Sequence, residues 1–269
     1  MGLSALATYE TQRMNTLDLE ETVKRKYADP AEVAEYAFLA GQGVTRFEAI
    51  LIERAFSPGQ LVLDIGCGGG REAVPMAQRG MRVVAMDLVP AMVQAARDRA
   101  MMQGVTVWPV VASATALPFH DRSFDGVTML GQVIAHVPSR PLRTATLMGV
   151  KQVLRPGGRV AMTTHNWRCH AKFRFYFFWV NRWRRLARWC GFPGVLGDND
   201  RWTSRISRAG SRAMVFFHMY DRNEALADLH QAGFQAVEGK SRAEFESGRE
   251  NLQVRDHDYL LGFLATRLV

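Results

Sequence analysis

The segment at residues 61–87, which reads LVLDIGCGGGREAVPMAQRGMRVVAMD, constrains the fold of this chain more than any other. An apolar run at 61–65 ends in a glycine cluster, and a second apolar run ends in an acid, Asp87. A strand that breaks into a glycine turn lets the backbone come close to a ligand. A carboxylate at the tip of the next strand can accept hydrogen bonds from both hydroxyls of a ribose. These features predict a nucleotide-type crevice at the carboxyl edge of a parallel sheet.

Short apolar runs continue to alternate with helical patterns along the rest of the chain. We expect strands at 61–65, 82–86, 106–111, 125–130, 158–164, 213–220, 234–238 and 258–266. We expect helices at 70–79, 90–103, 140–154 and 222–232. Strands that alternate with helices are typical of parallel βαβ units. The pattern therefore predicts a doubly wound α/β sheet of about seven strands.

The composition is that of one globular domain with a basic surface. The 269 residues are 48% hydrophobic, which is enough for one sizeable core, and the formal net charge is +8. Such a charge fits an anionic substrate, nucleic acid or an anionic membrane face. Three cysteines are too few for a disulfide scaffold. We find neither a signal-peptide pattern nor an apolar stretch of the roughly 18 residues that a membrane span needs, and we expect a cytoplasmic protein.

Three motifs distinguish the crevice from the one that binds NAD. Asp64 stands just before the first glycine, residues 113–127 read SATALPFHDRSFDGV, and residues 150–160 read VKQVLRPGGRV. In this order the motifs resemble class I S-adenosylmethionine-dependent methyltransferases, most closely the small-molecule group that includes the ubiquinone-biosynthesis type. The resemblance covers 45–165 well and 213–269 loosely. It implies a Rossmann-like, seven-stranded, mostly parallel sheet with an antiparallel last strand and helical lid insertions.

The resemblance also carries cofactor roles onto matching positions. The glycine turn is expected to line the methionine part of S-adenosylmethionine, and Asp87 is expected to hold its ribose. Ser113 stands where the family has an aspartate that meets the adenine amino group, and a hydroxyl makes a weaker contact there. The expected cofactor-binding residues are Asp64, Gly66, Cys67, Gly68, Asp87, Leu88, Met92, Ser113, Ala114, Leu130 and Gly131.

Two histidines follow strand ends that face the crevice in this fold, and either could take a proton from an acceptor. His136 follows the fourth expected strand and His165 ends the fifth. Histidine titrates near neutral pH, which suits a general base. Both residues could equally serve packing alone. We expect no metal site, because His165, Cys169 and His170 lack a fourth ligand at suitable spacing.

The segment at 166–212 interrupts the rhythm of strands and helices. It contains five of the six tryptophans and eleven Lys and Arg residues against two acids. Residues 171–190 predict a helix closed by Gly191, with aromatic residues on one face and arginines on the other. Such a helix could cover a hydrophobic acceptor as a lid, contact a membrane surface, or bind RNA. We favour the lid and do not expect a nucleic-acid partner.

We therefore predict one methyltransferase domain over residues 1–269. Residues 1–44 form an N-terminal helical cap, 45–165 the cofactor-binding core, 166–212 the lid insertion and 213–269 the rest of the core. The expected substrate-contacting residues are Tyr27, Tyr36, His165, Trp167, Phe175, Trp179 and Trp183.

The expected reaction is methyl transfer to an oxygen or nitrogen of a hydrophobic or aromatic small molecule, such as a secondary metabolite or a lipid-like compound. Two alternatives remain open. One is an RNA-modifying methyltransferase that uses the basic insertion, and the other is a non-catalytic regulator that binds S-adenosylmethionine. The sequence allows a peripheral membrane contact through 171–190 and makes no prediction of oligomeric state.

Overall fold

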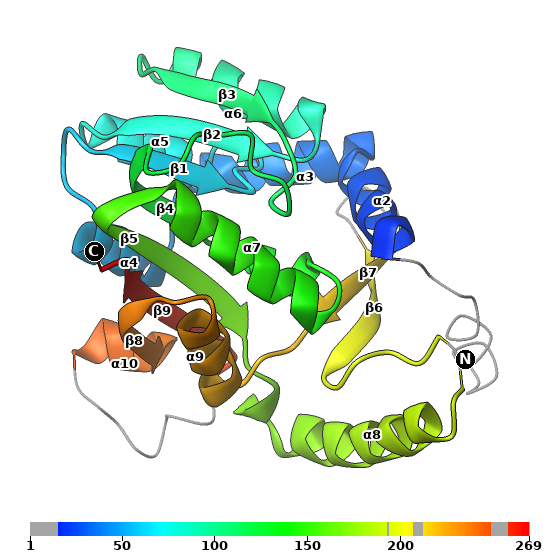
Figure 1. Ribbon diagram of the computed structural model, residues 1–269. Coiled ribbons are helices and arrows are strands. Elements are labelled where there is room, and N and C mark those ends of the chain that lie inside the picture. Colours follow the sequence, from blue (N-terminus) through cyan, green and yellow to red (C-terminus); the bar gives the residue numbers. More distant parts are fainter. Residues whose placement is uncertain (1–15, 193, 207–211, 249–257, 269) are drawn as a thin grey trace.

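The computed structural model describes residues 16–192, 194–206, 212–248 and 258–268, and its centre is a seven-stranded sheet (Figure 1). The strand order is β3-β2-β1-β4-β5-β9-β8. The strands are β1 (Leu61–Ile65), β2 (Arg82–Asp87), β3 (Val107–Val111), β4 (Phe124–Met129), β5 (Leu154–His165), β8 (Gln235–Ser241) and β9 (Leu260–Thr266). β9 runs antiparallel to both of its neighbours, β5 and β8, and the pairings among β1 to β5 are parallel. The predicted Rossmann-like sheet with an antiparallel last strand is confirmed.

Helices cover both faces of the sheet, because the side chains of its strands alternate between two apolar clusters. Along β1, Leu63 and Ile65 join one cluster and Val62 joins the other. The first cluster includes residues of α7 (Arg140–Val153) and α9 (Arg222–Gln231). The second includes residues of α4 (Arg46–Ala55), α5 (Ala73–Gln78), α6 (Pro90–Met102) and α10 (Arg242–Ser247).

The helix and strand ends follow local chemistry. Pro90 occupies the first turn of α6, where a missing N–H costs nothing, and Thr45 and Glu48 form a capping box at the start of α4. Helix α5 begins later than the expected 70–79, because the glycine-rich segment before it forms a turn. β5 begins at Leu154 instead of 158, and its pairing with β4 shifts register between Phe124 and Gly126.

The strand expected at 213–220 lies outside the main sheet. It is β7 (Arg212–His218), and it pairs antiparallel with β6 (Asp200–Ile206) in a separate two-stranded hairpin. An apolar run predicts a strand but not its partner, and here the partner lies inside the segment expected to be an insertion. The insertion after β5 thus extends to residue 218 and comprises α8 (Ala171–Trp189) and this hairpin.

A buried polar network joins α8 to the hairpin. The Arg184 side chain is fully buried and donates to the backbone carbonyls of Gly197 (3.2 Å) and Asp200 (2.7 Å). His218 lies between Asp200 (2.8 Å) and Glu224 (2.9 Å). Because buried polar groups are costly when unpaired, these bonds fix which side of α8 faces inward. In the described part of the chain, we find no helix with the length and apolarity that a membrane span requires.

Two more helices lie before the sheet. α2 (Thr16–Tyr27) and α3 (Pro30–Gly41) lie beside the ends of the strands (Figure 1). The first fifteen residues of the cap expected at 1–44 lie outside the described residues. Asp29 caps α3 through a hydrogen bond from the Ala31 N–H (2.8 Å).

Candidate functional site

The turn after β1 is held tightly against the end of β2. The backbone N–H groups of Gly66 and Cys67 donate to the Met86 carbonyl at 2.8 and 3.0 Å. Gly66 has φ +75°, and a Cβ at this position would lie 2.4 Å from Cγ2 of Val133. Both the backbone conformation and the crowding therefore require glycine here.

Helix α3 packs directly on the same turn. A Cβ on Gly69 would lie 3.0 Å from the backbone carbonyl oxygen of Tyr36 and 3.0 Å from the Cα of Ala37. The glycine cluster thus serves two contacts, one with the strand edge and one with the cap.

Asp87 ties the end of β2 to the glycine turn. One of its carboxylate oxygens accepts from the Gly68 N–H at 2.9 Å and the other from the Val89 N–H at 3.0 Å. Burial raises the pKa of Asp87, against the lowering effect of these backbone donors. Each carboxylate oxygen keeps a second lone pair, so the group can still accept two hydroxyl hydrogen bonds.

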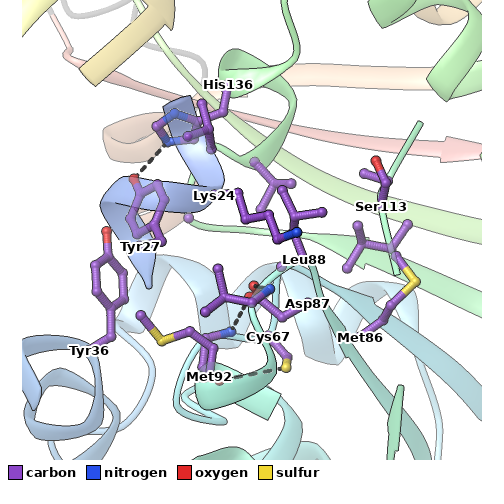
Figure 2. Close-up of a pocket in the computed structure, with 18 of the residues that line it drawn as sticks. Lys24, Tyr27, Tyr36, Cys67, Met86, Asp87, Leu88, Met92, Ser113 and His136 are labelled. Atoms are coloured by element: carbon purple, nitrogen blue, oxygen red, sulfur yellow. Dashed lines mark hydrogen bonds between the residues drawn. The ribbon is translucent and has the colours of Figure 1, made fainter. Parts of the chain in front are cut away.

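A cavity of about 330 Å³ opens above this turn, within the range of small-molecule sites. Figure 2 shows Asp87, Leu88 and Met92 at its base and Met86 and Ser113 along one wall. The structure brings to this cavity the following expected cofactor residues: Gly66, Cys67, Gly68, Asp87, Leu88, Met92, Ser113, Ala114, Leu130 and Gly131.

Asp64 does not line the cavity and lies buried beneath the turn, with 2% of its surface exposed. Burial, together with the negative charge of Glu72, raises the pKa of Asp64 well above its usual range. Its Oδ2 atom has no hydrogen-bond partner among the residues that the structure describes. The positive charge of Arg71 lowers that pKa, but by less than burial and Glu72 raise it.

Arg71 is a cavity residue that the sequence reasoning missed. Its guanidinium pairs with Glu48 at 2.6 Å and with Glu72 at 2.5 Å, and its side chain remains 26% exposed. Burial alone would lower the pKa of Arg71, but the charges of Glu72 and Glu48 outweigh it and raise that pKa. A permanent positive charge therefore lies at the edge of the cavity, next to Gly131. Its position directly after the glycine cluster could have identified Arg71 as a cavity residue from the sequence.

Ser113 is engaged in a hydrogen-bonded chain. Thr115 donates its hydroxyl to Glu20 at 3.4 Å, so the Thr115 oxygen accepts from the Ser113 hydroxyl at 2.8 Å. The Ser113 oxygen also accepts from the Thr115 N–H at 3.1 Å. The Ser113 oxygen keeps one lone pair, so it can still accept one hydrogen bond from an adenine amino group.

One face of α2 forms the opposite wall of the cavity. Glu20, Val23, Lys24 and Tyr27 follow helical spacing and all line it. Lys24 extends from α2 into the space between the two walls (Figure 2). Tyr27 was among the expected substrate contacts, whereas Glu20, Val23 and Lys24 were not.

Tyr27 and His136 form a pair at this wall. The Tyr27 hydroxyl and His136 Nε2 lie 3.2 Å apart (Figure 2). His136 Nδ1 lies 3.1 Å from the Phe216 carbonyl oxygen. A carbonyl only accepts, so the network assigns the proton to Nδ1 and leaves Nε2 as the acceptor from Tyr27. Tyr36, which also lines the cavity, packs edge-on against Tyr27 with ring centroids 5.5 Å apart.

His165 lies apart from this pair and does not line the cavity. Its ring stacks on Tyr259 at 4.5 Å and meets Phe217 edge-on at 5.5 Å. Phe217 also packs against His136 at 4.7 Å, so an aromatic ring lies between the two candidate bases. The structure places one of the two histidines at the cavity and the other in an aromatic stack.

The aromatic residues of the insertion are not brought to the cavity either. Trp167 packs against Phe177, and Phe175, Trp179 and Trp183 are exposed on the outer side of α8. Among the residues of 166–218 that the structure describes, none lines this cavity, so the structure does not bring the expected lid to it.

Comparisons with known proteins agree with this geometry. Residues 62–158 match the family model of a methyltransferase domain. An uncharacterised protein of Mycobacterium tuberculosis is 34% identical over 143 residues, which are 52% of this chain and 50% of that protein. A ubiquinone biosynthesis O-methyltransferase of Xanthomonas campestris is 39% identical over 114 residues, or 42% of this chain and 46% of that enzyme. The chain thus spans about half the length of the curated relatives it matches, or less.

A solved structure shows the same fold over more of the chain. A SAM-dependent methyltransferase from Methanosarcina mazei superposes with a TM-score of 0.61 and 19% identity, covering 84% of this chain and 99% of that one. At this identity, the likeness concerns the fold alone.

Proposed function

Because residues 62–158 form a class I S-adenosylmethionine-dependent methyltransferase domain, we propose that this chain transfers a methyl group from S-adenosylmethionine to an oxygen or nitrogen of a hydrophobic or aromatic small molecule. The single observation that carries the proposal is one cavity that joins the Asp87 end of β2 to the Tyr27–His136 pair. A donor and an acceptor can lie next to each other in such a space.

The residues around the turn fit the cofactor. Asp87 retains lone pairs for the ribose hydroxyls, and Leu88 and Met92 supply apolar surface for adenine. The cationic Arg71 at the edge of the cavity complements the carboxylate of the methionine part. When bound, the cofactor supplies an electrophilic methyl group on a sulfonium.

The α2 side of the cavity would hold the acceptor. Val23, Leu39 and Val133 provide apolar surface, and Tyr27 and Tyr36 provide rings with polar tips. Lys24 adds one positive charge, which suits an acceptor that carries an acidic group. Holding two reactants in line contributes up to about 7–11 kcal/mol in well-oriented cases, so positioning is the main task of these side chains.

His136 would take the proton that the acceptor loses. Its Nδ1–H is held by the Phe216 carbonyl, which keeps the Nε2 lone pair turned toward the Tyr27 hydroxyl. An acceptor hydroxyl at this place would donate to the Tyr27 oxygen, whose own proton is donated to Nε2. General-base assistance of this kind contributes roughly 10²–10⁴-fold to a rate.

The test is methyl transfer from labelled S-adenosylmethionine to a panel of phenols, carboxylic acids and amines with apolar groups. Turnover of at least one class is the expected result, with a higher KM for S-adenosylmethionine in Asp87→Ala and a strongly reduced rate in His136→Gln. Binding of S-adenosylhomocysteine without turnover on any class would favour a regulator instead. Turnover on RNA that weakens steeply with salt would favour the RNA-modifying alternative.

A further inference from the structure

Helix α8 presents an apolar, largely aromatic surface to solvent. We call this surface the outer face of α8. It consists of Phe175, Phe178, Trp179, Trp183, Leu186 and Trp189, which recur at helical spacing of three and four residues. Their exposed fractions range from 54% at Trp179 to 84% at Trp189. Aromatic and aliphatic groups gathered in one exposed stripe mark an interaction surface, unlike single exposed apolar residues.

The outward orientation of this face is fixed by bonds on the other side of the helix. Arg184 is 1% exposed and donates to the Asp200 carbonyl, and Asn181 donates to Asn199 at 2.8 Å. Arg188 donates to the Leu196 carbonyl at 2.6 Å. Turning α8 over would take these donors away from the Asp200 and Leu196 carbonyls and would bury Arg182 instead, so the outer face is not available to the protein's own core.

The charges along α8 are all of one sign. The helix contains Lys172, Arg174, Arg182, Arg184, Arg185 and Arg188 and no acidic residue. Arg185 and Arg188 share a single acid, Asp198, at 2.6 Å each. Arg182 borders a shallow hollow together with Trp179, Trp183 and Trp189. Arg182 forms no ion pair with any residue that the structure describes.

We propose that the outer face of α8 docks on a lipid bilayer that contains anionic headgroups. Tryptophan and phenylalanine side chains enter the boundary between headgroups and acyl chains, and arginines at the rim reach phosphate groups. An amphipathic helix with this composition lies in the plane of the surface and does not cross it. The net charge of +8 adds a general attraction to such a surface.

A second copy of this chain fits the outer face less well. In a two-fold contact the same face meets itself, so Arg182 would approach another basic helix. Since α8 has no acid, the partner's copy of the helix offers no counterion. Lipid phosphates supply the negative charge that a second α8 lacks.

RNA also fits less well. Bases stack on open ring faces, but Trp179 meets both Phe175 (interplanar angle 64°) and Phe178 (88°) edge to face. Trp179 is thus engaged with two neighbouring rings, and Leu186 offers neither a stacking surface nor a hydrogen bond. An apolar medium accommodates this surface without such requirements.

The test is flotation of the full chain with vesicles of phosphatidylcholine alone or mixed with phosphatidylglycerol. We expect binding to the mixed vesicles, and loss of most of it at about 1 M salt, where the Debye length is about 3 Å. Arg182→Gln should weaken partitioning about fivefold, the effect of one basic residue at an anionic surface. The double change Trp179→Ser, Trp183→Ser should weaken it roughly tenfold or more.

Trp108→Ser is the matched control, because Trp108 is a half-exposed tryptophan on β3, outside α8. It should leave vesicle binding unchanged, and circular dichroism should show the same thermal unfolding for all variants. Failure of the unaltered chain to bind mixed vesicles would overturn the proposal. So would α8-dependent dimerisation or RNA binding in its place, or equal vesicle binding by the double variant. The outcome does not depend on turnover, so it is separable from the proposed function.

Discussion

Replacing Asp87 by alanine tests the ribose contact on which the donor site depends. The carboxylate is buried and already accepts one backbone N–H at each oxygen, from Gly68 and Val89. Two ribose hydroxyls would add two charge-assisted hydrogen bonds, each worth about 1.5–3 kcal/mol. Since every 1.4 kcal/mol is about tenfold in affinity, loss of even one predicts tenfold to a hundredfold weaker binding of S-adenosylhomocysteine.

Asparagine is not a milder substitute at this position. A carboxamide has one accepting oxygen and one donating nitrogen, so either Gly68 or Val89 would face a donor with its own N–H. Alanine removes both acceptors instead, and should lower the free energy of unfolding by about 1–3 kcal/mol for each N–H left unpaired. Thermal unfolding without ligand measures that structural loss separately.

A comparison of ligands isolates the hydroxyl contact from the structural one. Calorimetry should show that the unaltered chain binds the 2′-deoxy analogue of S-adenosylhomocysteine about tenfold more weakly than the parent compound. Asp87→Ala should bind both compounds equally, because the group that distinguishes them is gone. If the variant still discriminates between them, another residue holds the ribose and the assignment of Asp87 is wrong.

Three further changes address the turn, the acceptor wall and the buried network. Gly66→Ala should lower the free energy of unfolding by about 1–3 kcal/mol more than Gly104→Ala in chemical denaturation, because Gly104 shares the positive φ but has open space around it. Tyr27→Phe should lower kcat by a larger factor than it changes KM, and it should leave S-adenosylhomocysteine binding intact. An unchanged kcat would show that Tyr27 does not assist His136 in proton transfer. Burial would lower the pKa of His218, but its bonds to two carboxylates outweigh this and raise that pKa. The resulting stability is complete below about pH 6.5 and is lost as pH rises through the raised pKa, so denaturation midpoints should fall in that direction and His218→Asn should remove the trend.

The donor side of this molecule could be predicted from sequence because its determinants are local. The turn residue Gly66 and the strand-end acid Asp87 are adjacent to the elements that place them, and parallel strands bring their carboxyl ends to one edge. Of the expected cofactor residues, Asp64 alone does not reach the cavity, because its side chain is buried beneath the glycine turn.

The acceptor side depended on contacts between distant segments, which no spacing rule specifies. A helical wheel shows that α8 has two faces but not which one is covered. The side that faces inward is fixed by hydrogen bonds from Arg184 to the carbonyls of Gly197 and Asp200. The contribution of Lys24 requires knowing that α2 lies over the strand ends. Likewise, the stack of His165 on Tyr259 joins the end of β5 to the residue just before β9, which are neighbours in the sheet but far apart in the sequence.

The four positions of α2 that face the cavity, Glu20, Val23, Lys24 and Tyr27, come from a single short helix before the first strand. None of them belongs to the glycine turn or to the strand end that carries Asp87. Under the function proposed above, substitutions in this helix would alter which acceptor is methylated and leave Asp87 and the glycine turn in place. Exchange of α2 between related chains would be an economical evolutionary route to a new acceptor on an unchanged donor site.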